Sequence, residues 1–242
     1  MTINPDTHHL SEQPASRGAG PTRAAAAGAA PSALRIVHPH RDVDLGAAEE
    51  AAAAFLTALG MDLTGESTHE TPRRMAAAYA EMFSPRPFDL TTFPNDQGYD
   101  ELVLARSIPV QSVCEHHLLP FIGVAHVGYL PGERIVGLSK LARVVEMFAR
   151  RPQVQERLTQ QIADWLQAEL APRGVGVVIE AEHLCMSVRG VRSAGTSTVT
   201  SALHGLLRDR PESRAEFLAL AMTGARQSSP PSLAAPATEP TE

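Results

Sequence analysis

Residues 137–166 read GLSKLARVVEMFARRPQVQERLTQQIADWL, and this stretch decides the class of fold. From Ser139 onward, apolar side chains recur every three or four residues, the spacing that places them on one face of a helix. Pro152 is expected to begin a second helix, because proline suits the first helical turn. This second helix is expected to end before Pro172 and Gly174. The expected buried faces are Leu141, Val144, Val145 and Phe148 in the first helix, and Val154, Leu158, Ile162, Trp165 and Leu166 in the second.

The segments on either side of this helical pair read as strands, because they are rich in β-branched residues and partly alternate in polarity. The expected strands cover residues 101–112, 122–130, 174–188 and 196–203, with a turn at Gly132 and Glu133. Further helices are expected over 47–59, before Gly60, and over 211–222. Another helix is expected to follow a capping Thr71, with Pro72 in its first position. Its expected apolar stripe is Met75, Ala78, Tyr79 and Met82. This order of elements indicates an α+β fold with hairpin-like strands rather than a doubly wound sheet.

The patterned region forms one expected domain, residues 34–226, with a helical part at 47–85 and a core at 100–223. It is bordered by two segments, 1–33 and 227–242, that are rich in Ala, Pro, Gly and Ser. Such segments bury too little apolar surface to offset the entropy of ordering, so both are predicted to be disordered.

Composition excludes several classes of protein. The net charge of -6 argues against a general nucleic-acid-binding surface, which usually carries a basic excess. No apolar run is long enough to cross a membrane, and the N-terminus does not resemble a secretory signal. Two cysteines are too few for a disulfide-stapled secreted scaffold, although one disulfide stays open. We therefore expect a cytoplasmic protein.

The chain's two cysteines both lie next to histidines, which suggests a metal site. Cys114 and His117 are three residues apart in CEHH, and His183 and Cys185 are two apart in HLC. On a strand, that second spacing places both side chains on one face. Cys114, His117 and Cys185 would give zinc three ligands and leave one position for water, as in catalytic zinc sites. A buried, non-ligating cysteine, or a closed structural site with His116 or His183 as fourth ligand, remains the alternative.

Four motifs together resemble GTP cyclohydrolase I, and they occur in that family's order. They are CEHH at 114–117, the helical stretch at 137–166, EAEHLCMSVRG at 180–190 and TSTVTSALHG at 196–205; TPRRMA at 71–76 is also similar to a family element. The resemblance covers about residues 47–223. It implies the tunnelling fold, an antiparallel sheet with helices on one face that assembles into a multi-subunit β-barrel. It also implies a homodecamer of two pentameric rings with active sites shared between subunits.

The resemblance further implies conversion of GTP and water to formate and 7,8-dihydroneopterin triphosphate, the first step of tetrahydrofolate and pterin biosynthesis. One Zn²⁺ per subunit would be bound by Cys114, His117 and Cys185, and its water would attack C8 of guanine. His116 and His183 would relay protons. The other implied site residues are Gln155 and Glu156 for guanine, Lys140, Arg143, Arg189 and Arg74 for the triphosphate, and Ser139 as proton donor to the ribose ring oxygen.

One position departs from the family pattern. Three residues after Arg74, many members carry a basic residue where this chain has Ala77. Arg73 is an imperfect substitute, because adjacent helical residues point about 100° apart. Two other interpretations stay open: a different enzyme of the tunnelling fold, such as a nitrile reductase or a pterin aldolase-like protein, and a non-catalytic zinc-stabilised ring that binds nucleotides or a regulatory partner.

Overall fold

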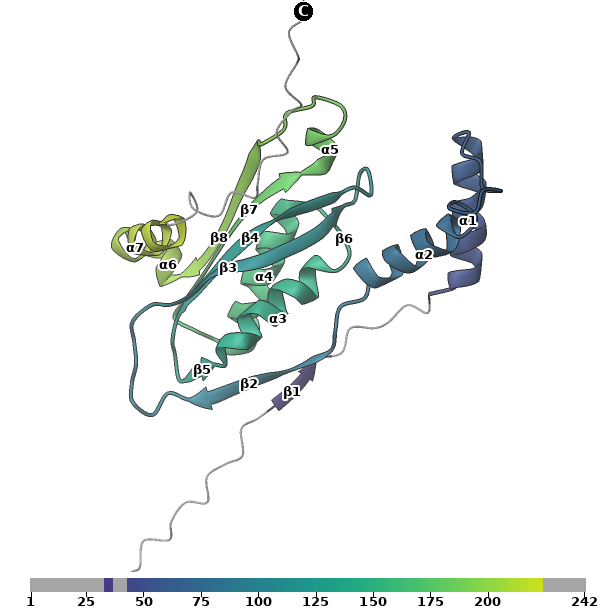
Figure 1. Ribbon diagram of the computed structural model, residues 1–242. Coiled ribbons are helices and arrows are strands. Elements are labelled where there is room, and N and C mark those ends of the chain that lie inside the picture. Colours follow the sequence, from purple (N-terminus) through teal and green to yellow (C-terminus); the bar gives the residue numbers. More distant parts are fainter. Residues whose placement is uncertain (1–32, 37–42, 224–242) are drawn as a thin grey trace, which may run out of the picture. The chain divides into compact units, whose positions relative to one another are not determined.

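The computed structural model describes residues 33–36 and 43–223. Its main sheet has the strand order β6-β3-β4-β7-β8 (Figure 1). These strands are β3 (Val103–Cys114), β4 (Pro120–Leu130), β6 (Pro152–Gln153), β7 (Gly174–His183) and β8 (Ser197–Gly205). All neighbours pair antiparallel except β3 and β6, which run parallel. Each of the four predicted strand segments contains a strand, although the segment over 174–188 is a strand only as far as His183, and the expected purely antiparallel sheet is wrong at β6.

Two helices, α3 (Leu138–Ala149) and α4 (Gln155–Leu170), cover one face of this sheet (Figure 1). Leu141, Val144 and Val145 of α3 are fully buried, as predicted, and so are Leu158 and Ile162 of α4. The prediction that Pro152 begins the second helix is wrong. Pro152 instead belongs to β6, which pairs with the end of β3, and α4 begins at Gln155. This long-range pairing overrides the local preference of proline for a helical start.

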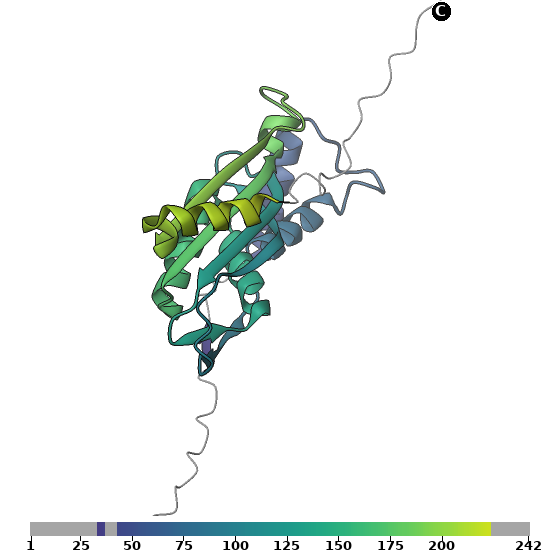
Figure 2. The same ribbon diagram turned by 90° about the vertical axis from the view of Figure 1, so that its left-hand side faces the viewer.

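The opposite face of the sheet is partly covered by α7 (Pro211–Met222), which Figure 2 shows lying across the strands. The predicted range of this helix is confirmed, but the expectation of helices on one face only is wrong. The Phe217 ring fits here because glycines leave room for it: a Cβ at Gly176 would lie 2.6 Å from this ring, and one at Gly128 would lie 3.0 Å from it. A short helix, α6 (Leu206–Asp209), which the sequence reading did not predict, leads into α7.

Replacing Phe217 with alanine is expected to lower the free energy of unfolding by about 3–5 kcal/mol, the usual cost of truncating a buried aromatic ring. Phe217 is fully buried against the sheet, whereas Leu220 on the same helix is 45% exposed. Leu220→Ala is therefore the matched control, with an expected loss within about 0.5 kcal/mol. Urea denaturation at one protein concentration measures both, and equal losses would show that α7 does not pack as described.

A second sheet has the strand order β1-β2-β5, formed by β1 (Ala33–Ile36), β2 (Phe88–Pro94) and β5 (Arg134–Val136). The sequence reading predicted neither β1 nor β2. The bend at Glu133 before β5 agrees with the predicted turn. The backbone N–H of Val136 donates to the Tyr129 hydroxyl at 3.1 Å, so this small sheet is tied to the end of β4.

The N-terminal helices are α1 (Leu45–Ala58) and α2 (Thr71–Met82). Gly60 follows α1 with φ 86°, the left-handed conformation expected of a glycine after a helix. Two details of α2 were predicted wrongly. Thr71 is the first helical residue rather than the cap, and the residues that α2 buries are Pro72 and Ala76. Of the predicted stripe, Met75, Tyr79 and Met82 are half-buried and Ala78 is exposed.

The predicted disordered segments fall outside the described residues, apart from Ala33 in β1. Within the described part of the chain, no helix is both long and apolar enough to cross a membrane.

Candidate metal centre

The two cysteines meet because β3 and β7, which flank β4 and run in the same direction, finish at the same end of the sheet. Cys114 is the last residue of β3, and β4 returns from there to pair with β7, with Phe121 opposite His183. Cys185 follows β7 by two residues. The ligand atoms of Cys114, His183 and Cys185 all lie within 4.8 Å of one another. The sequence-predicted association of the two cysteines is thus consistent with the fold.

The local structure at Cys185 differs from the prediction. The expected strand over 174–188 ends at His183, and residues Leu184–Ser187 form the short helix α5. Cys185 and His183 are therefore not on one face of a strand. They approach each other because the chain turns into α5 directly after His183. Both cysteines are free thiols, so the disulfide that the sequence left open is not formed.

The two histidines after Cys114 lie in an exposed turn. Their Nδ1 atoms are 3.7 Å (His116) and 3.9 Å (His117) from Sγ of Cys114. The turn is closed by the Leu118 N–H, which donates to the Cys114 carbonyl at 2.8 Å, and Leu118 itself has φ 52°. In the described residues, the group that meets within 4.8 Å contains His183 instead of His117. The assignment of His117 as third ligand stays a prediction.

His183 is held on two sides. Its ring stacks on Phe121, with ring centroids 4.6 Å apart and an angle of 10° between the planes. Its Nε2 lies 2.7 Å from Oε1 of Gln155, at the start of α4. Burial lowers the pKa of His183 below its ordinary value, and the nearby Glu156 carboxylate opposes that shift. The ring is therefore fixed in position beside the two thiols.

The donor set suits zinc. Two sulfurs and an imidazole are the borderline-soft ligands that zinc prefers in proteins. Burial raises the pKa of the Cys185 thiol, and the hydrogen bond with Cys114 and the charge of Cys114 raise it further. A divalent cation between the sulfurs would reverse this upward shift of the thiol pKa, because the thiolate is the form that binds metal. The residues present therefore fit a zinc ion.

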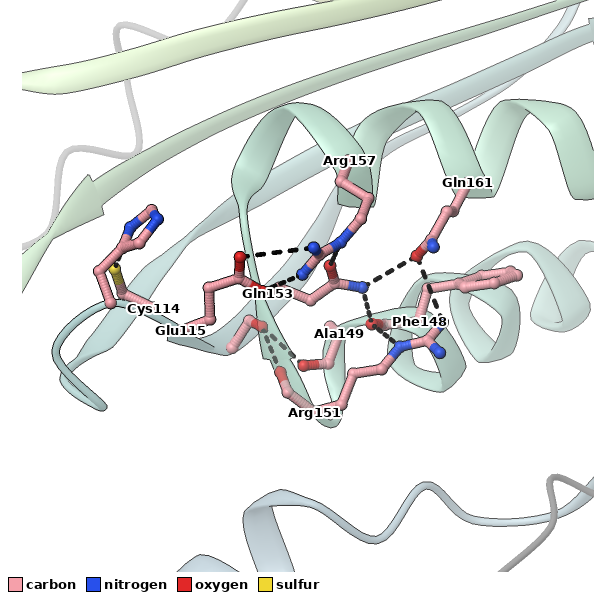
Figure 3. A network of polar contacts seen from close by, with 10 residues as sticks. Cys114, Glu115, Phe148, Ala149, Arg151, Gln153, Arg157 and Gln161 are labelled. Carbon is pink, nitrogen blue, oxygen red and sulfur yellow. Dashed lines mark hydrogen bonds and ion pairs between the residues drawn. The ribbon is translucent and has the colours of Figure 1, made fainter.

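A polar network around Gln153 connects the turn that follows Cys114 to α4 (Figure 3). Gln153 is 1% exposed. Its Nε2 donates to the Phe148 carbonyl at 2.9 Å, and its Oε1 accepts from Nε of Arg157 at 3.0 Å. The Arg157 guanidinium also forms an ion pair with Glu115, the residue after Cys114. The Arg157 hydrogen bond holds the pKa of Glu115 below its usual value.

The backbone reinforces this connection. The Glu115 N–H donates to the Gln153 carbonyl at 3.0 Å, within the β3–β6 pairing that places Cys114 opposite Gln153. The Ser112 hydroxyl donates to the Ala149 carbonyl at 2.7 Å. The end of β3 is therefore fixed to the junction between α3 and α4. This arrangement limits how far Cys114 can move relative to the helix that carries Gln155.

The remaining predicted site residues lie on several elements. Glu156 is exposed in the first turn of α4, and its charge acts on His183. Arg189 is exposed after α5, and its charge acts on Cys185. Arg74 is exposed on α2, whereas Arg73 donates from Nε to Glu70 at 2.6 Å. Arg73 thus pairs with the N-cap residue of its own helix, and the expectation that it replaces the missing basic residue poorly stays a prediction.

The residues predicted to bind phosphate on α3 lie in its first two turns, whereas the helix contacts β3 at its last residue. Ser139 and Lys140 lie in the first turn of α3, and Arg143 follows one turn later, paired with Glu146 at 3.2 Å. The other end of α3 touches the metal strand through Ala149 and Ser112. Eleven helical steps of about 1.5 Å each place Leu138, the start of α3, about 16.5 Å from that contact. Figure 1 shows this start beside β5, away from the turn between β3 and β4.

The sequence did not predict the three residues of the polar network next to Cys114, which are Glu115, Gln153 and Arg157. Polar residues around a helix start ordinarily read as solvated. Gln153 is buried because β6 pairs with β3, and no local pattern encodes that pairing. The one available signal was that Glu115 lies directly beside Cys114 in the CEHH motif.

Known proteins resemble this chain over the same region. Residues 48–222 match the family model described as GTP cyclohydrolase I. GTP cyclohydrolase 1 of Streptomyces avermitilis is 55% identical over 180 residues, 72% of this chain and 89% of that protein. GTP cyclohydrolase 1 of Aquifex aeolicus is 52% identical over 178 residues, 74% of this chain and 97% of that protein. The apo crystal structure of the archaeosine synthase QueF-Like shares 18% identity over 43% of this chain and 93% of that chain, with a TM-score of 0.37. The family match and the identity to these two cyclohydrolases place this chain in the GTP cyclohydrolase I family.

Proposed function

We propose that the protein hydrolyses and rearranges GTP to 7,8-dihydroneopterin triphosphate and formate, as the first step of tetrahydrofolate and pterin biosynthesis in the cytoplasm. Membership of the GTP cyclohydrolase I family supports GTP cyclohydrolase activity. The observation that carries the finer proposal is the meeting of Cys114, Cys185 and His183 within 4.8 Å.

One Zn²⁺ per subunit would be held by Cys114, Cys185 and His117, with His183 beside it. Such an ion would supply a Lewis acid that lowers the pKa of water and makes it a nucleophile for C8 of guanine at neutral pH. Three protein ligands leave the open position that this chemistry needs. The network of Gln153, Arg157 and Glu115 would keep Cys114 in place while substrate binds and product leaves.

The side chains around this group have distinct proposed roles. The exposed Glu156 carboxylate would accept hydrogen bonds from N1–H and the 2-amino group of guanine, and so orient C8 toward the thiols. His183 and His116 would carry protons as the imidazole ring of guanine opens and formate leaves. Ser139 would protonate the ribose ring oxygen in the later rearrangement of the sugar.

The triphosphate would be bound by Lys140, Arg143 and Arg189, with Arg74 joining from a neighbouring subunit. Free N–H groups at the start of α3 favour an anion there. The distance of about 16.5 Å between that start and the contact of α3 with the strand of Cys114 supports active sites shared between copies. A homodecamer of two pentameric rings, with sheets joined into a barrel, would bring these parts together and cover the edge of β8 and the part of β3 that β6 does not pair.

Incubation of the zinc-loaded protein with GTP is the direct test. We expect release of one formate per GTP and a product that becomes fluorescent on oxidation to a pterin, both followed over time. A protein that binds zinc fully yet releases neither would instead be the non-catalytic ring, with His183 closing the metal site. GTP turnover without formate would point to a different enzyme of the same fold.

A further inference from the structure

Gln155 is the buried partner of His183, and its hydrogen bonds are all made within the protein. The side chain is 1% exposed. Its Nε2 lies 3.1 Å from the Ile179 carbonyl, 2.9 Å from the Thr198 carbonyl and 3.1 Å from Oγ1 of Thr200. Its Oε1 lies 2.7 Å from Nε2 of His183. The amide thus joins α4, β7 and β8 to the histidine beside the thiols.

The partners fix which end of the amide faces the histidine. A carbonyl oxygen accepts hydrogen bonds and never donates, so the amide atom facing Ile179 and Thr198 must be the nitrogen. Reversing the amide would set Oε1 against two carbonyl oxygens and leave buried acceptors without donors, which is costly. The orientation of Gln155 is therefore determined by chemistry as well as by distance.

The neighbouring threonines agree with this orientation. The Thr159 hydroxyl donates to the Gln155 backbone carbonyl at 2.8 Å. Thr159 and Thr200 are 2.7 Å apart at their hydroxyl oxygens, and because Thr159 already donates its proton, Thr200 donates in this pair. The Thr200 oxygen can then accept from Nε2 of Gln155. A closed ring of hydrogen bonds holds the amide with its nitrogen toward the strands.

The orientation of the Gln155 amide selects the tautomer of His183. Because Oε1 of Gln155 can only accept, the hydrogen bond at 2.7 Å requires a proton on Nε2 of His183, and of the two neutral forms of the ring only the Nε2–H tautomer carries that proton. We propose that Gln155 is a positioning residue that holds His183 as the Nε2–H tautomer, leaving the Nδ1 lone pair for the reaction. The stacked Phe121 ring sets the plane in which that lone pair points.

This role replaces the guanine contact that the sequence suggested for Gln155. Both ends of the amide are occupied by protein groups, and the side chain is buried, whereas Glu156 beside it is exposed. A neutral ring with a defined lone pair can accept a proton from a reacting group or ligate a metal, and the opposite tautomer can do neither at Nδ1. This consequence rests on the proposed function. The tautomer itself does not.

The tautomer can be measured directly by solid-state NMR on the zinc-loaded full-length protein with ¹⁵N-labelled histidine. The chain has ten histidines, and loss of one signal in His183→Asn assigns the residue. We expect a directly bonded proton on Nε2 of His183 and none on Nδ1. A proton on Nδ1 in the wild-type protein overturns the proposal without any further variant.

Two leucine variants test whether Gln155 is the cause. Gln155→Leu is expected to give a mixture of both His183 tautomers. Gln153→Leu is the matched control, because Gln153 is equally buried in the same segment but bonds to Phe148, Gln161 and Arg157. It is expected to keep the wild-type tautomer. An unchanged His183 signal in folded Gln155→Leu contradicts the proposal.

Steady-state kinetics separate positioning from substrate binding. We expect Gln155→Leu to lower kcat for GTP about 10- to 100-fold, the usual cost of losing an outer partner of a site histidine, with little change in KM. A raised KM with unchanged kcat would contradict the positioning role and support a contact between Gln155 and guanine. If the wild-type protein does not turn over GTP, the proposed function fails while the NMR result still decides the tautomer.

Discussion

Replacing Cys185 with serine is expected to abolish zinc binding and to lower GTP turnover by about a thousandfold or more, because a bound metal contributes several kcal/mol to such a transition state. A serine hydroxyl stays protonated at neutral pH and is a poor zinc ligand beside a thiolate. Metal analysis of the purified protein and the formate assay measure the two effects together.

Met186 provides the control for this variant, since it lies next to Cys185 on α5 and its side chain has no proposed role. Met186→Leu conserves volume and is expected to keep zinc and turnover. If Cys185→Ser retained both zinc and activity, the metal would have to be held elsewhere. Loss of zinc with full activity would instead remove the metal from the chemistry.

The helical pair could be predicted from the sequence because its information is local. Buried positions such as Leu141 and Leu158 follow the helical period. Pro152 could not be predicted in the same way. Its place in β6 depends on pairing with Val113, almost forty residues earlier, and a proline before a helix fits both structures equally well.

The candidate metal site, like the fold, could be predicted from the sequence only in part. Composition singled out Cys114 and Cys185, and the fold brings them together. The environment of His183 was not predictable, because Phe121 and Gln155 reach it through strand register and helix packing. The same reason explains Gln155 itself. A polar residue beside an exposed Glu156 reads as solvated until the strands that bury it are in place.

Co-expression of two inactive variants is expected to restore GTP turnover if active sites are shared between copies. One variant is Cys185→Ser, which lacks the metal. The other is Lys140→Ala/Arg143→Ala, expected to lose about a hundredfold or more in kcat/KM through two missing charge-assisted phosphate contacts. Random mixing in a ring should return about a quarter of wild-type activity, since a site needs one intact contribution from each of two copies.

The control is the triple variant, with all three changes in one chain, co-expressed with wild-type protein. Shared sites again give about a quarter of the activity, whereas sites built within one chain give about half. For the two inactive variants, sites within one chain give no recovery at all. Because the start of α3 lies about 16.5 Å from its contact with the strand of Cys114, we expect recovery. Its absence, with mixed assemblies verified by mass, would require one chain to bind both guanine and triphosphate.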